Sequence, residues 1–231
     1  MNRKFFRALA GVAALTLAAG VASADPLAAS TVLTSGPLTF TGFTATINGT
    51  GTYTPTTASA ISVSALTTGQ PGIQFTGGFD AFGAGSSGDV ALNYVVSASP
   101  GTKISDIFLG LSGAVLVGYS NVSVLECAYA DAAHTMPLDG GNCLQVTDPP
   151  PVLTGELALG GNYSTVYVTK DINFNAHSCT DTEGGCPAQA GLSIIDQRFS
   201  TVPEPGTLAL FGAGLLGCGL VIARRRRSMQ S

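Results

Sequence analysis

Apolar and polar residues alternate along much of the chain between Leu38 and Ser200, and a helical spacing is hard to find there. Alternation with a period of two is typical of strands that are buried on one face. The segments "AISVSAL", "DVALNYVVS", "NVSVLEC" and "STVYVTKDINF" show this alternation. The apolar residues expected on the buried faces are Ile61, Val63 and Ala65, then Val90, Leu92, Tyr94 and Val96, and then Val166, Val168, Ile172 and Phe174.

Clusters of Gly, Pro, Asn, Ser and Asp separate these short segments, namely "TTGQPG", "FGAGSSGD", "ASPGTK", "DGGN" and "DPPP". Short strands at this spacing predict an all-β fold, an antiparallel β-sandwich of jelly-roll or Ig-like type. No internal repeat of fixed period is present, which argues against a solenoid or a propeller. Residues 25–201 are enough for one domain with a sizeable core. The run 149–151 is then a stiff proline loop, and the alternative is a boundary between two halves.

The first 24 residues have the three parts of a secretory signal peptide. A cationic segment precedes a short apolar segment, and small residues stand at Ala22 and Ala24, where signal peptidase requires them. We expect cleavage after Ala24, which leaves Asp25 at the mature N-terminus. The alternative, an uncleaved membrane helix, is disfavoured because the apolar segment is short for a span.

Export to an oxidising compartment favours disulfides among the four cysteines of the body, for which three connectivities are possible. Closeness in sequence favours the pairs Cys127–Cys143 and Cys179–Cys186. Closing a loop of about 15 residues, as the first pair does, is worth about 3 kcal/mol in the chain-entropy model. The fifth cysteine, Cys218, lies in the apolar tail and is expected to be a small apolar residue there.

Charge is distributed unevenly along the chain. Only 10% of the 231 residues are charged, and the formal net charge is −4. Between Asp25 and Glu204 the three cations Lys103, Lys170 and Arg198 stand against fourteen acids, a net charge of −11. Nucleic-acid binding needs a basic surface, so this acidic body argues against it. A surface that keeps an exported protein soluble explains the charge most simply.

Threonine recurs through "TFTGFTATINGTGTYT", at Thr39, Thr41, Thr44, Thr46, Thr50, Thr52 and Thr54. Regular Thr-x-Thr arrays on flat sheets order water in some ice-binding proteins. Here the phase breaks near Gly42 and near Gly49, so a flat, uninterrupted array is not expected. The alternative is the solvent-exposed face of a strand, where β-branched threonine is favoured.

No catalytic or metal-binding motif emerges, and we predict neither an enzyme nor a cofactor. His134 and His177 are the only histidines, and their spacing from the cysteines matches neither a CxxC pair nor a Cys2His2 finger. Asp139, Asp181 and Glu183 lie in loops with glycine but lack EF-hand spacing, so we expect turn residues there in preference to Ca²⁺ ligands. A secreted hydrolase is the enzymatic alternative, and no GxSxG elbow supports it.

The C-terminal segment, 202–231, consists of a Pro–Glu–Pro motif, an uncharged and mostly apolar stretch, and a basic cluster. The uncharged stretch, 207–223, would be about 26 Å long as a helix, near the lower limit for crossing a bilayer. By the positive-inside rule the basic cluster would hold the C-terminus in the cytoplasm and leave the body outside. That cluster is Arg224, Arg225, Arg226 and Arg227.

This tail resembles the PEP-CTERM sorting domain of exported proteins of Gram-negative bacteria, because all three parts stand in order at the C-terminus. The resemblance implies recognition by an exosortase, a membrane-embedded cysteine transpeptidase that cleaves near the motif. Pro203, Glu204 and Pro205 would be the recognition residues, and the arginines would retain and orient the chain in the inner membrane. Proteins with this tail are often associated with exopolysaccharide and biofilm, and the tail is sometimes named an ice-binding C-terminal domain.

We therefore expect a non-enzymatic protein of the cell surface or extracellular matrix, exported by the Sec route and anchored transiently in the inner membrane. Its partners would be signal peptidase, an exosortase and exopolysaccharide, with no nucleic acid. The alternative is a glycan- or ice-binding module on the same β scaffold.

Overall fold

The computed structural model describes residues 25–177, 187–204 and 206, and within these ranges the protein is all-β. In the same ranges two short 3₁₀ turns, η1 (Ala58–Ala60) and η2 (Asp139–Gly141), lie between strands. The strands of the described ranges are β1 (Asp25–Pro26), β2 (Leu33–Ser35), β3 (Leu38–Thr54), β4 (Ser62–Ala65), β5 (Gly72–Ala98), β6 (Thr102–Ser112), β7 (Val115–Val117), β8 (Asn121–Tyr129), β9 (Leu144–Asp148), β10 (Thr154–Tyr163), β11 (Thr165–Ala176) and β12 (Gln189–Pro203).

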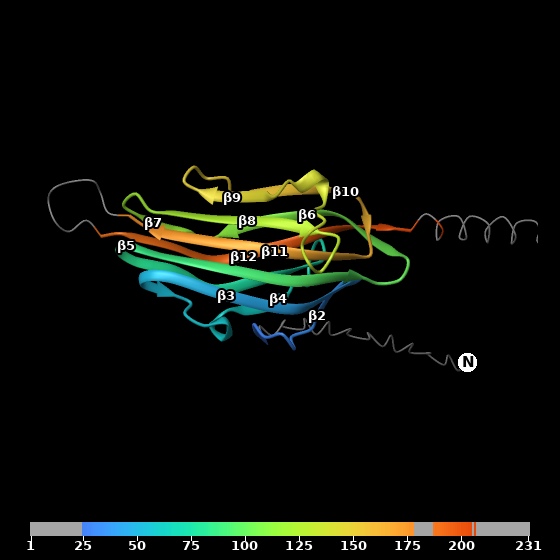
Figure 1. Cartoon of the computed structure of the whole chain (residues 1–231), viewed down its shortest axis with the longest axis horizontal. Coiled ribbons are helices and arrows are strands. Elements are labelled where there is room, and N and C mark those ends of the chain that lie inside the picture. Colours follow the sequence, from blue (N-terminus) through green and yellow to red (C-terminus); the bar gives the residue numbers. More distant parts are fainter. Residues whose placement is uncertain (1–24, 178–186, 205, 207–231) are drawn as a thin grey trace, which may run out of the picture.

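The strands form two layers that share the long strand β5 (Figure 1). In the first layer the order is β10-β6-β12-β5-β4-β1, and it uses the first half of β5. The second layer uses the other half of β5, and its order is β9-β8-β11-β5-β3-β2. All of these pairings are antiparallel, as the sequence predicted.

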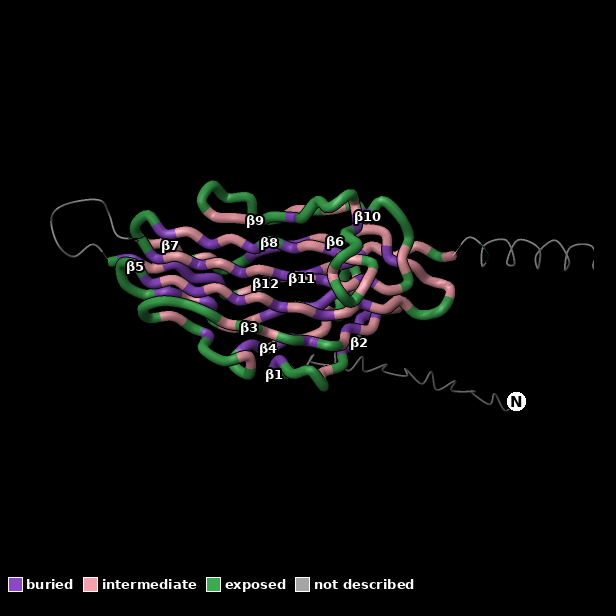
Figure 2. Tube along the Cα trace, viewed as in Figure 1, coloured by how far each residue is buried: buried purple, intermediate pink, exposed green. Residues whose placement is uncertain are grey.

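Side chains from the two layers meet in a common core. Aromatic rings pair across the layers at Phe40 and Phe199, whose centroids are 5.6 Å apart, and at Phe79 and Phe174, at 6.3 Å. The predicted alternation is confirmed, because buried and less buried positions alternate along β5 and β11 (Figure 2). Of the residues predicted to be buried, Val90, Leu92, Tyr94, Val96, Val166, Val168, Ile172 and Phe174 are all at most 1% exposed.

Strand β5 continues through "FGAGSSGD", so the prediction of two separate strands on either side of this cluster was wrong. Gly83 and Gly85 have positive φ angles of 85° and 79°, which glycine adopts without strain. The Ser86 hydroxyl donates to the Phe82 carbonyl at 2.6 Å and accepts from the Thr52 amide at 3.1 Å. The cluster therefore forms an internally bonded bulge, at which β5 passes from the first layer to the second.

The triple proline lies in the turn between β9 and β10, with Thr147 and Val152 closing it by two backbone hydrogen bonds of 3.0 and 2.8 Å. This turn joins two strands of the same sandwich. Within the described ranges, no helix is both long and apolar enough to cross a membrane. The predicted signal peptide with its cleavage site at Ala22 and Ala24, the helix 207–223 and the arginines 224–227 lie outside the described residues.

Candidate functional site

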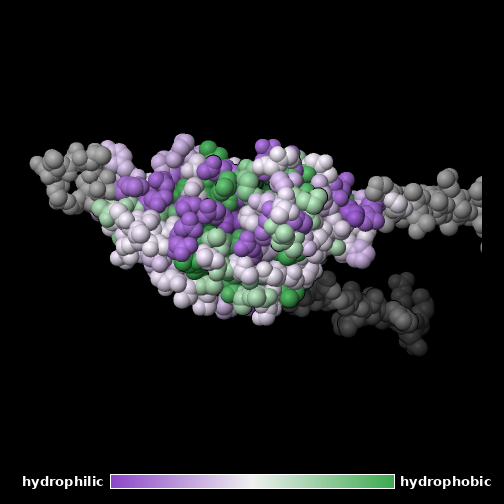
Figure 3. Space-filling view, in the orientation of Figure 1, coloured by the Kyte–Doolittle hydropathy of each residue, from purple (hydrophilic) through white to green (hydrophobic). Residues whose placement is uncertain are grey.

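The outward face of the second layer carries aligned polar side chains, and we call it the outer polar face. The register places one residue from each of β3, β5, β11 and β8 in every row across it. The rows are Thr41–Val95–Tyr167–Tyr129, Thr44–Asn93–Thr169–Cys127, Thr46–Ala91–Asp171–Leu125, Asn48–Asp89–Asn173–Ser123 and Thr50–Ser87–Asn175–Asn121. In the view of Figure 3, hydrophilic residues gather over the middle of the molecule.

Two irregularities in β3 keep its threonines on this face. Register shifts occur between Thr41 and Thr44 and between Thr50 and Thr52, with Gly42 and Gly51 at positive φ. The first shift is a bulge that offsets the change of phase between Thr41 and Thr44, whereas the second faces the β5 bulge, with one residue of β3 opposite four of β5. The predicted break near Gly42 is confirmed, whereas the break predicted near Gly49 was wrong, because the register is continuous from Thr44 to Thr50. The threonine line is one strand wide, because its partners on β5 are Ser97, Val95, Asn93, Ala91 and Ser87.

Hydrogen bonds between neighbouring side chains orient the amides of the outer polar face. Asn173 donates to Asp171 at 3.0 Å, and Asn93 donates to the Thr44 hydroxyl at 3.3 Å. The pKa of the Asp89 carboxyl is raised, first by partial burial and then by the charge of Asp171. The face thus holds amide donors, hydroxyls and two mutually repelling carboxylates in fixed positions.

One end of the outer polar face is aromatic. Tyr129 and Tyr167 are register partners, and the His134 ring lies over them with centroid distances of 5.0 and 6.5 Å. His134 belongs to the loop between β8 and β9, and the Asp131 carboxylate shapes this loop by accepting bonds from the Thr135 and Met136 amides at 3.0 and 2.7 Å. Partial desolvation raises the pKa of Asp131, but these hydrogen bonds outweigh it and lower the pKa overall.

A disulfide between Cys127 and Cys143 closes the same loop, with the two Cα atoms 4.5 Å apart. This confirms the first predicted pair. Cys179 and Cys186, the second pair, lie outside the described residues. Because Cys127 stands on the outer polar face beside Thr169, the disulfide fixes the loop that carries His134 against the aromatic end.

The two histidines are far apart. His134 contacts Tyr167, whereas His177 lies ten positions further along the chain, at the opposite end of β11. In the part of the chain that the structure describes, no three His, Cys, Asp or Glu side chains cluster as metal ligands would. Asp181 and Glu183 are outside that part.

The sorting motif begins inside the fold. Pro203 is the last residue of β12 and pairs with Thr102, and the Glu204 amide donates to the Gly101 carbonyl at 3.0 Å. The Glu204 carboxylate lies 3.2 Å from Lys103 Nζ. Pro205 lies outside the described residues. The strand thus continues two residues beyond the predicted domain boundary at residue 201.

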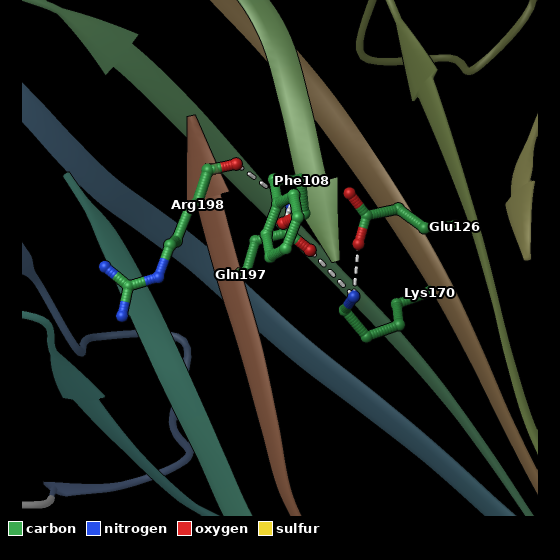
Figure 4. Close-up of polar contacts among 5 residues, drawn as sticks. All are labelled: Phe108, Glu126, Lys170, Gln197 and Arg198. Carbon is green, nitrogen blue, oxygen red and sulfur yellow. Dashed lines mark hydrogen bonds and ion pairs between the residues drawn. The ribbon is translucent and has the colours of Figure 1, made fainter. Parts of the chain in front are cut away.

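A buried polar cluster that was not predicted from the sequence is formed by Glu126 on β8, Lys170 on β11 and Gln197 on β12 (Figure 4). Lys170 Nζ donates to Glu126 Oε2 and to Gln197 Oε1, the latter at 2.9 Å, and Gln197 Nε2 donates to the Phe108 carbonyl at 3.1 Å. The alternation could have indicated this cluster, because Lys170 and Glu126 each stand at a position that the pattern of their strand assigns to the buried face.

Burial dominates the electrostatics of this cluster. It raises the pKa of Glu126 against the opposing charge of Lys170, and it lowers the pKa of Lys170. The nearby Tyr94 hydroxyl is fully buried, and its pKa is raised by burial and then by the charge of Glu126. Neither this hydroxyl nor Glu126 Oε1 has a hydrogen-bond partner among the described residues.

The fold and the tail together define an exported class of protein: a β-sandwich body followed by a sorting signal. The PEP-CTERM protein-sorting motif matches residues 201–227, so the chain carries this motif. The motif implies processing by an exosortase and export to the cell envelope and surface.

Three solved structures are similar to the chain at a low level. They are the carbohydrate-binding module TmCBM61 in complex with β-1,4-galactotriose (12% identity, 69% of this chain and 88% of that chain, TM-score 0.28), carbohydrate-binding modules of the β-sandwich superfamily (11%, 70% and 57%, TM-score 0.29) and tailspike protein 4 of bacteriophage CBA120 (8%, 68% and 19%, TM-score 0.28). No curated protein matches the sequence.

Proposed function

We propose that the protein is a non-enzymatic, glycan-binding protein of the cell surface, delivered through its PEP-CTERM tail. The observation that carries this proposal is the outer polar face, on which the register aligns hydroxyl, amide and carboxylate groups beside an aromatic end. The ligand would be an extracellular polysaccharide chain lying across β3, β5, β11 and β8.

The chemistry of the face suits a sugar chain. Sugar hydroxyls both donate and accept hydrogen bonds, and the face offers the Asn93 and Asn173 amides together with the Asp89 and Asp171 carboxylates. The rings of Tyr129, His134 and Tyr167 offer an apolar surface with a polar edge. Ligand-binding sites use such groups to fix the orientation of the ligand. The disulfide-closed loop holds this aromatic end in place before the ligand arrives, which lowers the entropic cost of binding.

Affinity electrophoresis of the full chain in gels containing the producing strain's own polysaccharide tests the binding. We expect Tyr167→Ala to weaken retardation about tenfold or more, as loss of an aromatic anchor does. Tyr119→Ala is the matched control, because Tyr119 is 65% exposed and its amide bonds to His177 at the other end of the molecule. Equal retardation of the wild type and both variants, in this gel and on a glycan array, would remove the proposal.

An ice surface is the other candidate ligand of the threonine line. The threonines lie on β3 alone, and the neighbouring strand β5 has no parallel row of threonines that could match a two-dimensional ice lattice. We therefore expect no thermal hysteresis. Thermal hysteresis that disappears on replacing Thr44 and Thr46 by Val would favour ice over glycan.

Sorting is tested separately by Glu204→Gln. We propose that the body lies outside the inner membrane, the motif at its outer surface and the arginines inside, so that an exosortase reaches Glu204. The variant should accumulate in the inner membrane with its tail still attached, measured by fractionation and mass spectrometry. Processing at the wild-type rate would contradict the recognition role.

A further inference from the structure

The buried cluster brings an amine, a carboxyl and a carboxamide into contact at the centre of the sandwich. Lys170 is 1% exposed, and Glu126 and Gln197 are fully buried. Lys170 and Glu126 are register partners in the second layer, whereas Gln197 reaches them from the first layer (Figure 4). The proposed glycan-binding function uses none of the three.

We propose that Lys170 and Gln197 condense into an intramolecular isopeptide bond that joins the two layers, with Glu126 as the catalytic proton carrier. The lysine amine replaces the carboxamide nitrogen of Gln197, and one molecule of ammonia is released. No oxidant, metal or second substrate is needed.

The steps balance within the three side chains. The Lys170 ammonium first transfers a proton to the Glu126 carboxylate, and the neutral amine attacks the side-chain carbonyl carbon of Gln197. Glu126 then protonates the departing nitrogen and takes up the proton that the new N–C bond releases. The bond from the carbonyl carbon to Nε2 breaks, a bond to Lys170 Nζ forms, and Glu126 ends as a neutral acid.

The geometry fits this sequence of steps. Since a carbonyl carbon lies about 1.2 Å from its oxygen, and Nζ is 2.9 Å from Gln197 Oε1, the reacting atoms are within about 4.1 Å of each other. Rotation about the last side-chain torsion of Gln197, which is broad for a carboxamide, turns the carbonyl face toward the amine. The Phe108 carbonyl accepts from Nε2 at 3.1 Å, next to the bond that would break.

The surroundings favour the neutral forms that the reaction needs. Burial lowers the pKa of Lys170 and raises the pKa of Glu126, so proton transfer from the amine to the carboxylate costs less than it would in water. The reaction also removes a buried pair of charges, whose desolvation is expensive. The hydroxyl of Tyr94 is also fully buried, has no hydrogen-bond partner among the described residues and interacts electrostatically with Glu126.

Trypsin separates the linked and unlinked protein directly. Between Lys103 and Arg198 the only other trypsin site is Lys170, so an unlinked chain gives peptides 104–170 and 171–198 after reduction of its disulfides. An isopeptide-linked Lys170 cannot be cut, and the expected product is a single peptide 104–198 that is lighter by one ammonia molecule. Cleavage at Lys103 in the same digest shows that the protease is active. The full chain is purified from the envelope fraction for this experiment.

Variants then assign the roles. Gln197→Met removes the electrophile, and Glu126→Gln removes the proton carrier, so both should give the two separate peptides at full mass. Gln189→Met, on the same strand β12, is the matched control and should keep the linked peptide. Circular dichroism and the Cys127–Cys143 disulfide report whether each variant folds.

Three outcomes would overturn the proposal. Separate peptides 104–170 and 171–198 from the wild-type chain would show that no bond forms. A linked peptide lighter by one water molecule would place the bond at Glu126, which this mechanism excludes. A linked peptide in Glu126→Gln would remove the catalytic role of the carboxylate. Because the wild-type digest alone decides the first point, failure of a variant to fold leaves the test intact.

Discussion

The described part of the chain contains two Lys–Glu ion pairs, one exposed and one buried, and they differ in the contacts that hold them. Lys103 and Glu204 lie 3.2 Å apart at the end of β12, with side chains 28% and 43% exposed. Lys170 and Glu126 lie in the core with both side chains fully buried. Water screens the first pair, whereas the second pair has lost its hydration and depends on its neighbours.

The difference shows that the same chemical pair has different consequences in the two places. An exposed pair typically contributes 0 to about 1 kcal/mol, since its Coulomb attraction is offset by solvent and by side-chain entropy. A buried pair costs several kcal/mol of desolvation per ion, and removal of one partner leaves a charge with no compensation. The exposed pair therefore mainly positions Glu204 of the sorting motif. The buried pair constrains how the two layers pack.

The largest effect is expected from breaking the buried pair on one side. Lys170→Met removes the proposed isopeptide bond, leaves Glu126 buried without its partner, and should lower the free energy of unfolding by about 3–5 kcal/mol or more. Urea unfolding followed by circular dichroism measures it. A loss below about 1 kcal/mol would mean that the interior pair behaves like a surface pair, and the comparison would fail.

Removing both buried charges sharpens the comparison. The double variant Lys170→Met with Glu126→Leu replaces the pair by apolar groups and should be more stable than Lys170→Met alone. It should stay below the wild type, because the Gln197 carbonyl then lacks its donor, at a cost of about 1–3 kcal/mol. A double variant less stable than Lys170→Met would show that Glu126 needs no partner.

A smaller effect is expected from pH. Burial raises the folded-state pKa of Glu126 above its ordinary value of 4.5, so the folded protein binds this proton more tightly than the unfolded chain does. The stability from this group is complete below pH 4.5 and is lost as the pH rises through the raised pKa. Urea unfolding at several pH values above 4.5 should show this decline, and Glu126→Gln should flatten it. An unchanged slope in the variant would assign the decline to other groups.

The smallest effect is expected from the exposed pair. Lys103→Met should change the free energy of unfolding by less than about 1 kcal/mol, and added salt should reduce the difference further. The same urea titration, repeated at low and high salt, measures it. A loss comparable to that of Lys170→Met would show that the end of β12 is coupled to the core.

The strands were largely predictable because their alternation records which face is buried. "DVALNYVVS" and "STVYVTKDINF" became the paired strands β5 and β11, with the expected residues inside. The same alternation contained Lys170 at an inward position, but only the apolar residues were counted there. The charge of Lys170 at an inward position could therefore have indicated the buried cluster. Its partner Gln197 lies on another strand, β12, and no local sequence pattern connects the two.

The glycine clusters were less predictable, because the same residues form turns and bulges. "ASPGTK" turns the chain between β5 and β6, whereas "FGAGSSGD" lies inside β5. The difference depends on pairing with β3 and β12 on either side, which is tertiary information. For the same reason the outer polar face could not be assembled from the threonine line alone, since Asn173 and Asp171 come from another strand.

At the end of β12, almost no linker separates the folded body from its sorting signal. Pro203 is still paired with Thr102, and the Glu204 amide is hydrogen-bonded to the Gly101 carbonyl. The first residue of the motif is therefore part of the sheet, and the second is hydrogen-bonded to the adjoining turn. A processing enzyme must either accommodate the folded end of the body or break these last backbone hydrogen bonds of β12. The aromatic end belongs to this same end, since β11 begins there beside the end of β5. Until the tail is cut, the proposed ligand and the processing enzyme would therefore compete for space at one pole of the molecule.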